Sequence, residues 1–231
     1  MYALPFRQGD KIVFIGDSIT DKGRKTDPLQ LGGGYVRVLH DYMWTAHPDK
    51  ALTIINEGTS GNRVTDLQRR WQLDVLDHKP DWLSVSIGIN DVWRQLDAAH
   101  GEQVYPDQFE AVFRELLQTA VRETGCRLIL MQPTVIKEIS GSTGNELLRP
   151  YIAIVNRLAN EFDAILVRTH EAFQAQLARQ TGKPLTTDGV HMTTHGDMLM
   201  AVTWLDAVSQ VAKQQEEARG EAGENAPIFK R

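Results

Sequence analysis

The sequence predicts an α/β fold in which helices cover both faces of a parallel sheet. Short runs of β-branched and aliphatic residues alternate along the chain with longer stretches whose apolar residues recur at helical spacing. This alternation is typical of βαβ units, which place parallel strands side by side. The 231 residues are enough for one such domain to bury a substantial core.

Five segments are expected to form the strands, because each is short, apolar and rich in Ile, Val and Leu. They are residues 11–17, 52–58, 82–88, 127–134 and 164–169. The first three run into polar, glycine-containing loops with the sequences GDSIT, NEGTSGN and GIND. Open parallel sheets bind ligands beyond the carboxyl ends of their strands, so a functional site is expected at these loops.

The segments between the strands are expected to be helices that pack on the sheet. They cover residues 35–48, 64–79, 107–124 and 146–162, with a final helix over roughly 194–218. Asp107 is the expected N-cap of the third helix, and Gly125 is the glycine expected just after its last turn.

Residues 1–218 are expected to form a single domain, and residues 219–231 a C-terminal tail. The tail is rich in Gly, Glu and Ala, which favours a mobile segment. Its closing Ile228 and Phe229 offer the alternative of docking on a neighbouring subunit, so a homo-oligomer is possible.

Charge and composition exclude several classes of partner. The net charge is -5 with acids and bases interspersed, so no basic face for nucleic acid is expected. No stretch approaches the roughly 20 apolar residues of a membrane span, and the N-terminus lacks the pattern of a leader. The lone Cys126 cannot form an internal disulfide, so no oxidising compartment is required. These features favour a cytoplasmic protein.

The sequence offers a serine together with a base to activate it. A serine hydroxyl needs a base at neutral pH, and the base needs a group that fixes its tautomer. Ser18 lies at the mouth of the first strand, in IVFIGDSITDKG. The segment TTDGVHMTTHG supplies His191 as a base and Asp188, three residues earlier, as its orienting carboxylate. The alternative is that Asp188 caps the final helix and His191 is a surface histidine.

A metal or nucleotide site has less support in the sequence. His191 and His195 have the spacing of two zinc ligands on a helix, but Met192 stands where a zincin has its glutamate. No third ligand is evident, so neither a metal nor another cofactor is expected, and His195 is expected to pack or hydrogen-bond within the helix. The GGG run at 32–34 matches no phosphate-binding motif and is interpreted as a flexible turn before a helix.

Two further residues are candidates for binding an oxyanion, which forms when a hydroxyl attacks a carbonyl. Gly61, in TSGN, can offer a backbone N–H without an obstructing side chain, and Asn90, in GIND, can offer a carboxamide N–H. The alternatives are a turn glycine with positive φ at Gly61 and an Asx-turn at Asn90.

Taken together, GDSIT, TSGN, GIND and DGVH resemble the four signature blocks of the SGNH hydrolases, also called GDSL esterases and lipases. The blocks occur in the family's order and span residues 16–191. The resemblance implies a three-layer, flavodoxin-like fold with five parallel strands, with Ser18 as nucleophile, His191 as base and Asp188 as its orienter. The oxyanion hole it implies consists of the Ser18 and Gly61 amides and the Asn90 side chain. Ile19 replaces the leucine of the GDSL motif, a change of similar volume.

Several stretches also resemble the acetylxylan esterases of this superfamily, namely GGGYV, INEGTSGN and KPDWLSVSIGINDVWRQ. Trp93 suits the apolar face of a sugar and Arg94 its hydroxyl groups, and Asp17, beside the nucleophile, is a third candidate for substrate binding. The alternative is that Trp93 packs under a loop and Arg94 forms a subunit contact.

The predicted function is a serine esterase that removes acetyl groups from saccharides such as acetylated xylo-oligosaccharides through an acyl-enzyme. The alternatives are a short-chain carboxylesterase or lipase-like enzyme and a non-catalytic carbohydrate-binding module.

Overall fold

Five parallel strands form the central sheet, in the order β2-β1-β3-β4-β5. The structure is a computed structural model that describes residues 1–97, 102–180 and 182–224. The strands are β1 (Lys11–Gly16), β2 (Thr53–Gly58), β3 (Trp82–Ser86), β4 (Arg127–Met131) and β5 (Ile165–Val167). Each lies within the segment predicted for it, and the predicted α/β class with a five-stranded parallel sheet is confirmed.

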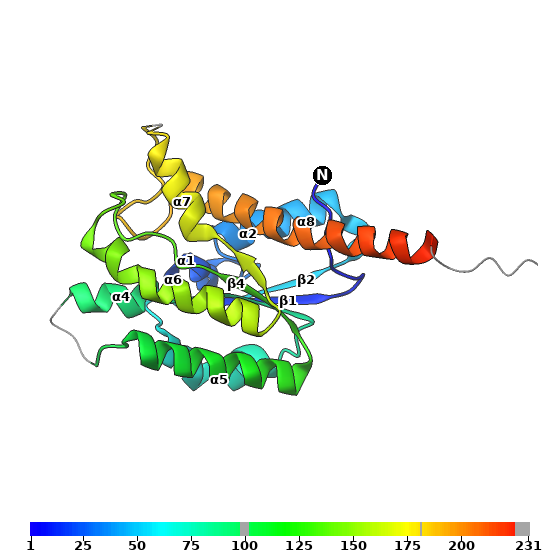
Figure 1. The fold of residues 1–231 in the computed structure, drawn as a ribbon, viewed down its shortest axis with the longest axis horizontal. Helices are drawn as coiled ribbons and strands as arrows, with labels where there is room; N and C mark the ends of the chain where they lie inside the picture. Colours follow the sequence, from blue (N-terminus) through cyan, green and yellow to red (C-terminus); the bar gives the residue numbers. More distant parts are fainter. Residues whose placement is uncertain (98–101, 181, 225–231) are drawn as a thin grey trace, which may run out of the picture.

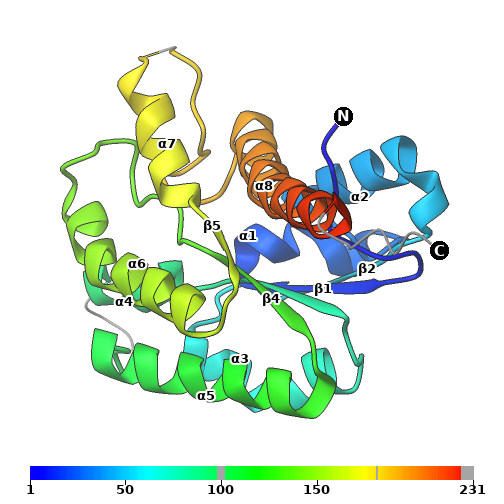
Figure 2. The same cartoon turned by 45° about the vertical axis from the view of Figure 1, so that its right-hand side comes forward.

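Helices cover both faces of this sheet (Figures 1 and 2). On one face, α2 (Tyr35–Ala46) packs against α8 (Thr194–Glu224), and α8 also contacts α7 (Thr169–Ala178). On the other face, α5 (Pro106–Thr124) packs against both α3 (Val64–Trp71) and α6 (Thr143–Glu161). The result is the three-layer arrangement that the family resemblance implied.

Two short helices follow strands directly and were not predicted. They are α1 (Ser18–Asp21), which follows β1, and α4 (Ile89–Leu96), which follows β3. The helix α7 was also missed. The predicted helix over 64–79 ends as an α-helix at Trp71 and continues as a π-helical turn over Gln72–Leu76.

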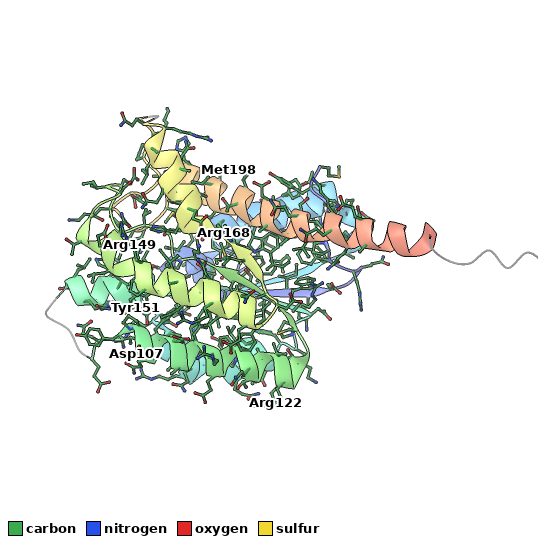
Figure 3. The ribbon with its side chains drawn as sticks, in the orientation of Figure 1. Asp107, Arg122, Arg149, Tyr151, Arg168 and Met198 are labelled. Atoms are coloured by element: carbon green, nitrogen blue, oxygen red, sulfur yellow. The ribbon has the colours of Figure 1, made fainter. Side chains whose placement is uncertain are left out.

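The predicted boundaries of α5 are correct at one end only. The helix begins at Pro106 with Tyr105 as its N-cap, so Asp107 lies in the first turn and is not the cap (Figure 3). Proline favours this first helical position because its missing N–H has no helical partner there. At the other end Gly125 adopts a left-handed conformation with φ 70° and donates its N–H to Val121 O, as predicted.

The final helix α8 continues to Glu224, beyond the predicted end near residue 218. Ile228 and Phe229, which were considered for docking on a subunit, lie outside the described residues. In the part of the chain that the structure describes, no helix has the length and apolar character needed to cross a membrane.

The order of the strands determines where a ligand can bind. From β1 the chain crosses to β2 on one side and then to β3 on the other, so the connections diverge between β1 and β3. This is the switch point at which open α/β sheets bind ligands. Ser18 follows β1 and Asn90 follows β3, so both lie at this edge of the sheet.

Candidate active site

Ser18 is the first residue of a helical turn that starts where β1 ends. A Cβ at Gly16 would lie 2.4 Å from Ser86 O, so only glycine allows β1 and β3 to approach this closely here. Asp17 then caps α1, its Oδ1 accepting the Ile19 N–H at 2.9 Å. Lys22 ends the turn in a left-handed conformation, and its N–H donates to Ser18 O. The local hydrogen bonds therefore fix the backbone that carries the serine.

The segment that carries Asp188 and His191 is a tight hairpin before α8. Thr187 N–H donates to His191 O at 2.7 Å, and a bridge joins Thr186 to Met192. Asp188 Oδ1 accepts the backbone N–H of His191 at 2.8 Å, so the carboxylate shapes the turn that presents the imidazole. Since α8 begins only at Thr194, the alternative that Asp188 caps this helix is wrong.

The connection between β4 and α6 braces this hairpin from outside. Glu138 Oε1 accepts the N–H of Leu185 at 2.8 Å and the hydroxyl of Thr186 at 2.7 Å. Lys137 N–H donates to Gly189 O at 2.7 Å, next to Asp188. These contacts hold the histidine-bearing hairpin against the body of the domain.

The two loops bring serine, histidine and aspartate into one chain of hydrogen bonds. His191 Nε2 lies 2.9 Å from Ser18 Oγ, and His191 Nδ1 lies 2.6 Å from Asp188 Oδ2. Desolvation raises the pKa of Asp188, but the hydrogen bonds from the His191 ring and backbone outweigh it and lower this pKa to about 2. A carboxylate that is ionised at neutral pH and bonded to Nδ1 leaves Nε2 free to accept the serine proton.

Gly61 and Asn90, the predicted oxyanion donors, lie on two segments that are joined by a hydrogen bond between Asn90 and Asn62. Gly61 has φ 81°, a conformation that suits glycine, and precedes Asn62 in the loop after β2. Asn90 is buried in the first turn of α4, and its Nδ2 donates to Asn62 O at 3.0 Å. A carboxamide has two N–H donors, so one remains for an oxyanion. The structure thus places Asn90 on a helix and not in an Asx-turn.

Trp93 and Arg94, one turn further along α4, also border the site. The Trp93 ring meets the His191 ring edge to face, with 5.8 Å between centroids and 69° between planes. A Cβ at Gly61 would lie 3.7 Å from Arg94 Nη2, so the guanidinium lies beside the loop that carries Gly61. Both side chains are half-buried. The structure therefore brings to the site the two residues expected to bind substrate.

The structure does not support the expectation that Asp17 binds substrate. It is only 2% exposed, and its carboxylate is used as the α1 cap beneath Ser18. Burial raises the pKa of Asp17 to about 7, although the Ile19 N–H and the nearby His191 oppose this rise. A group enclosed in this way lies out of reach of a sugar.

His195 also differs from expectation. It lies exposed on the first turn of α8, so the expected packing within the helix is wrong. Across residues 1–97, 102–180 and 182–224, no group of three or more His, Cys, Asp or Glu side chains is arranged to hold a metal ion. The two ring nitrogens of His191 are instead engaged by Ser18 and Asp188.

The sequence that forms this site matches that of a known family. Residues 14–199 match the profile of the GDSL-like Lipase/Acylhydrolase family. The chain belongs to this family. Membership confirms the resemblance to SGNH hydrolases and the prediction of a carboxylic ester hydrolase.

Relatives of this GDSL-like hydrolase share most of its length. It is 38% identical over 205 residues to an acetylxylan esterase of Geobacillus stearothermophilus, a match that covers 85% of this chain and 93% of the relative. The crystal structure of Axe2, an acetylxylan esterase from the same organism, superposes with a TM-score of 0.82 at 36% identity, covering 88% of this chain and 95% of the other. LAE5, an alpha/beta hydrolase from the metagenome of Lake Arreo, Spain, also gives 0.82, at 33% identity and with 88% and 96% covered.

Residues that the sequence did not single out connect the loops of this GDSL-like hydrolase. Asp21, at the end of α1, accepts both the N–H and the hydroxyl of Ser60, the residue before Gly61. Arg70, on α3, donates to Gly16 O and to Asn62 Oδ1. The only available signal was the position of Asp21, three residues after Ser18 and therefore on the same side of a helical turn.

The buried Asp91, next to Asn90, was missed as well. Both of its carboxylate oxygens accept the Val64 N–H, at 3.1 and 3.4 Å, so it ties α4 to the start of α3. Burial raises the pKa of Asp91 to about 7, despite the hydrogen bond from Val64. This carboxyl supports the helix that carries the predicted oxyanion donor.

Proposed function

We propose that this GDSL-like hydrolase is a serine esterase that removes acetyl groups from short xylo-oligosaccharides. The observation that carries the proposal is the continuous hydrogen-bonded path from Ser18 Oγ through His191 to Asp188. The 38% identity to an acetylxylan esterase supports the choice of acetylated saccharides as the substrate class.

In the first half-reaction Ser18 Oγ attacks the acetyl carbonyl carbon while His191 Nε2 takes the hydroxyl proton. Asp188 stabilises the resulting imidazolium through Nδ1. The Ser18 and Gly61 amides and the Asn90 carboxamide donate to the carbonyl oxygen as it becomes negative. Collapse of this intermediate breaks the bond to the sugar oxygen, which leaves with the proton from His191. The products are a sugar hydroxyl and an acetyl ester on Ser18.

In the second half-reaction a water molecule takes the place of the sugar. His191 removes a proton from the water, the resulting hydroxide adds to the acetyl carbonyl, and the same three donors hold the oxyanion. Breakdown of the second intermediate releases acetate, and the proton returns from His191 to Ser18 Oγ. No cofactor takes part in either step.

Recognition of the sugar is assigned to Trp93 and Arg94. Trp93 contacts the His191 ring and Arg94 lies beside Gly61, so both border the position of the ester. Indole rings pack against the C–H face of a sugar, and a guanidinium donates to its hydroxyls.

Replacing Arg94 tests this assignment. Losing a charged hydrogen bond costs about 1.5–3 kcal/mol, so Arg94→Ala is expected to raise KM for acetylated xylobiose about tenfold or more. The KM for p-nitrophenyl acetate, which has no sugar, is expected to stay near the wild-type value. An equal loss on both substrates would assign Arg94 to the oxyanion loop instead.

A substrate panel separates the proposal from its two alternatives. The enzyme is expected to cleave acetylated xylo-oligosaccharides and p-nitrophenyl acetate faster than p-nitrophenyl octanoate or longer esters. Faster cleavage of long-chain esters would favour the lipase-like alternative. Sugar binding without turnover of any ester would favour the carbohydrate-binding module.

The location in the cell and the oligomeric state are part of the proposal. A cytoplasmic location is supported by the single Cys126, which cannot form an internal disulfide. Cell fractionation tests it. A homo-oligomer is proposed from the resemblance to acetylxylan esterases, and light scattering of the purified chain measures the assembled mass.

A further inference from the structure

Lys22 forms hydrogen bonds to both of the segments that carry Ser18 and His191. Its backbone N–H donates to Ser18 O at 3.0 Å and closes the turn that begins with the nucleophile. Its side-chain Nζ donates to Met192 O at 2.5 Å, one residue after His191. A single residue therefore joins the serine turn to the histidine hairpin.

Asp197 holds the Lys22 side chain in this position. Its Oδ2 lies 3.4 Å from Lys22 Nζ, and it belongs to the first turn of α8, where a carboxylate also interacts well with the helix dipole. The Asp197 side chain is only 4% exposed, and in the described residues its Oδ1 has no hydrogen-bond partner. A buried carboxylate of this kind needs a cation beside it.

The glycine run at 32–34 leaves room for this pair. A Cβ at Gly34 would lie 3.0 Å from Lys22 Cβ and 3.2 Å from Asp197 Oδ1. Gly33 N–H donates to Lys22 O at 3.0 Å, and a Cβ at Gly32 would lie 2.4 Å from Asp21 O. Side chains at Gly32 or Gly34 would push the chain away from the Lys22–Asp197 pair, whereas a Cβ at Gly33 would meet no atom within 4 Å. Two glycines of the run that was interpreted as a flexible turn are therefore closely packed, at positions 32 and 34.

We propose that Lys22 and Asp197 are positioning residues that hold the histidine hairpin at hydrogen-bonding distance from the nucleophile, with Gly32 and Gly34 providing the space. The inference rests on the proposed roles of Ser18 and His191. Neither Lys22 nor Asp197 touches the substrate. They act by fixing the separation of two loops that are distant in sequence, and errors of about 1 Å in such geometry cost about 10²-fold in rate.

The test compares Lys22→Met with Lys25→Met, a matched change at an exposed lysine of the same segment. Lys22→Met is expected to lower kcat on p-nitrophenyl acetate by about 10- to 100-fold while KM stays within twofold. The rate at which a fluorophosphonate labels Ser18 is expected to fall by a similar factor. Lys25→Met is expected to behave as wild type in both assays.

A double variant separates positioning from stability. Lys22→Met alone leaves Asp197 buried without a cation, so a lower Tm is expected. In Lys22→Met/Asp197→Asn that charge is gone, and Tm is expected to recover. kcat is expected to stay low, because the bond to Met192 O is still missing. Millimolar methylammonium is expected to restore part of kcat to Lys22→Ala.

Recovery of both Tm and kcat in the double variant, or normal kcat in Lys22→Met, would overturn the inference. If Ser18→Ala is inactive in the same assays, either of these two outcomes overturns the positioning inference but leaves the proposed function intact. An esterase activity that survives Ser18→Ala would overturn the proposed function and the inference with it.

Discussion

Replacing Asp17 with Asn tests the finding that this carboxyl is buried beneath Ser18 and is therefore out of reach of a substrate. Asn is as good an N-cap as Asp, so its side-chain oxygen is expected to keep accepting the Ile19 N–H. The substitution removes the ionisable group and little else. Its effects on stability therefore report the burial of this one charge.

The magnitude follows from the pKa of Asp17, which burial raises from 3.8 to about 7. Between these values the folded chain keeps a proton that the unfolded chain loses, so wild-type stability falls as pH rises from about 4 to about 7. A change of one pKa unit corresponds to about 1.4 kcal/mol, so ionised Asp17 lowers stability at pH 8 by up to about 4 kcal/mol. Asn has no such dependence.

Urea unfolding of both proteins at pH 4, 6 and 8 provides the measurement. Asp17→Asn is expected to match wild type at pH 4 and to exceed it increasingly up to pH 8. Its KM for acetylated xylobiose is expected to stay within twofold, because the residue is 2% exposed. A stability difference that does not change with pH, or a tenfold rise in KM, would show that Asp17 is accessible and would refute this reasoning.

Two further substitutions probe the proposed reaction. Asn90→Ala is expected to lower kcat on p-nitrophenyl acetate by about 10²-fold or more, the scale of one lost oxyanion donor; kcat within a few-fold of wild type would remove Asn90 from the hole. Asp188→Asn is expected to lower kcat by about 10⁴-fold at pH 7, because Asn at this position favours the wrong tautomer of His191. Its Tm is expected to change by only a few degrees, since Asp188 is half exposed, and a small kcat effect would contradict its role as orienter.

The strands and the four sequence blocks could be predicted because their signals are local. A buried parallel strand needs a continuous apolar run, and Ile12 to Ile15 in β1 are fully buried, as such a run predicts. The carboxyl ends of the first three strands then bring Ser18, Gly61 and Asn90 to one edge of the sheet. The sheet topology therefore made the positions of these distant loops predictable.

The short helices escaped prediction because their signals are weak or depend on tertiary contacts. α1 has only four residues, held by the Asp17 cap and by the left-handed Lys22, so it shows no helical periodicity. α4 begins at Ile89 inside the GIND block, where the glycine and polar residues favoured a loop. Its polar Asn90 and Asp91 are buried by contacts with the loop before α3 and with α3 itself.

The burial and pairing of polar side chains could not be predicted from the sequence either. Asp17 was expected to face substrate because it adjoins Ser18, but the direction of its side chain is fixed by the turn that it caps. Lys22 and Asp197 lie 175 residues apart, and nothing in either local sequence indicates that they meet. Their contact depends on how α8 packs beside α2 and the glycine run that precedes it.

The most direct test of the account is covalent labelling of the chain with a fluorophosphonate, followed by peptide mass spectrometry. We predict one adduct per chain, on Ser18, with loss of acetylesterase activity in proportion to labelling. Ser18→Ala is predicted to remain unlabelled and inactive. An adduct on another residue, or full acetylesterase activity in Ser18→Ala, would contradict the assignment of this serine as the nucleophile.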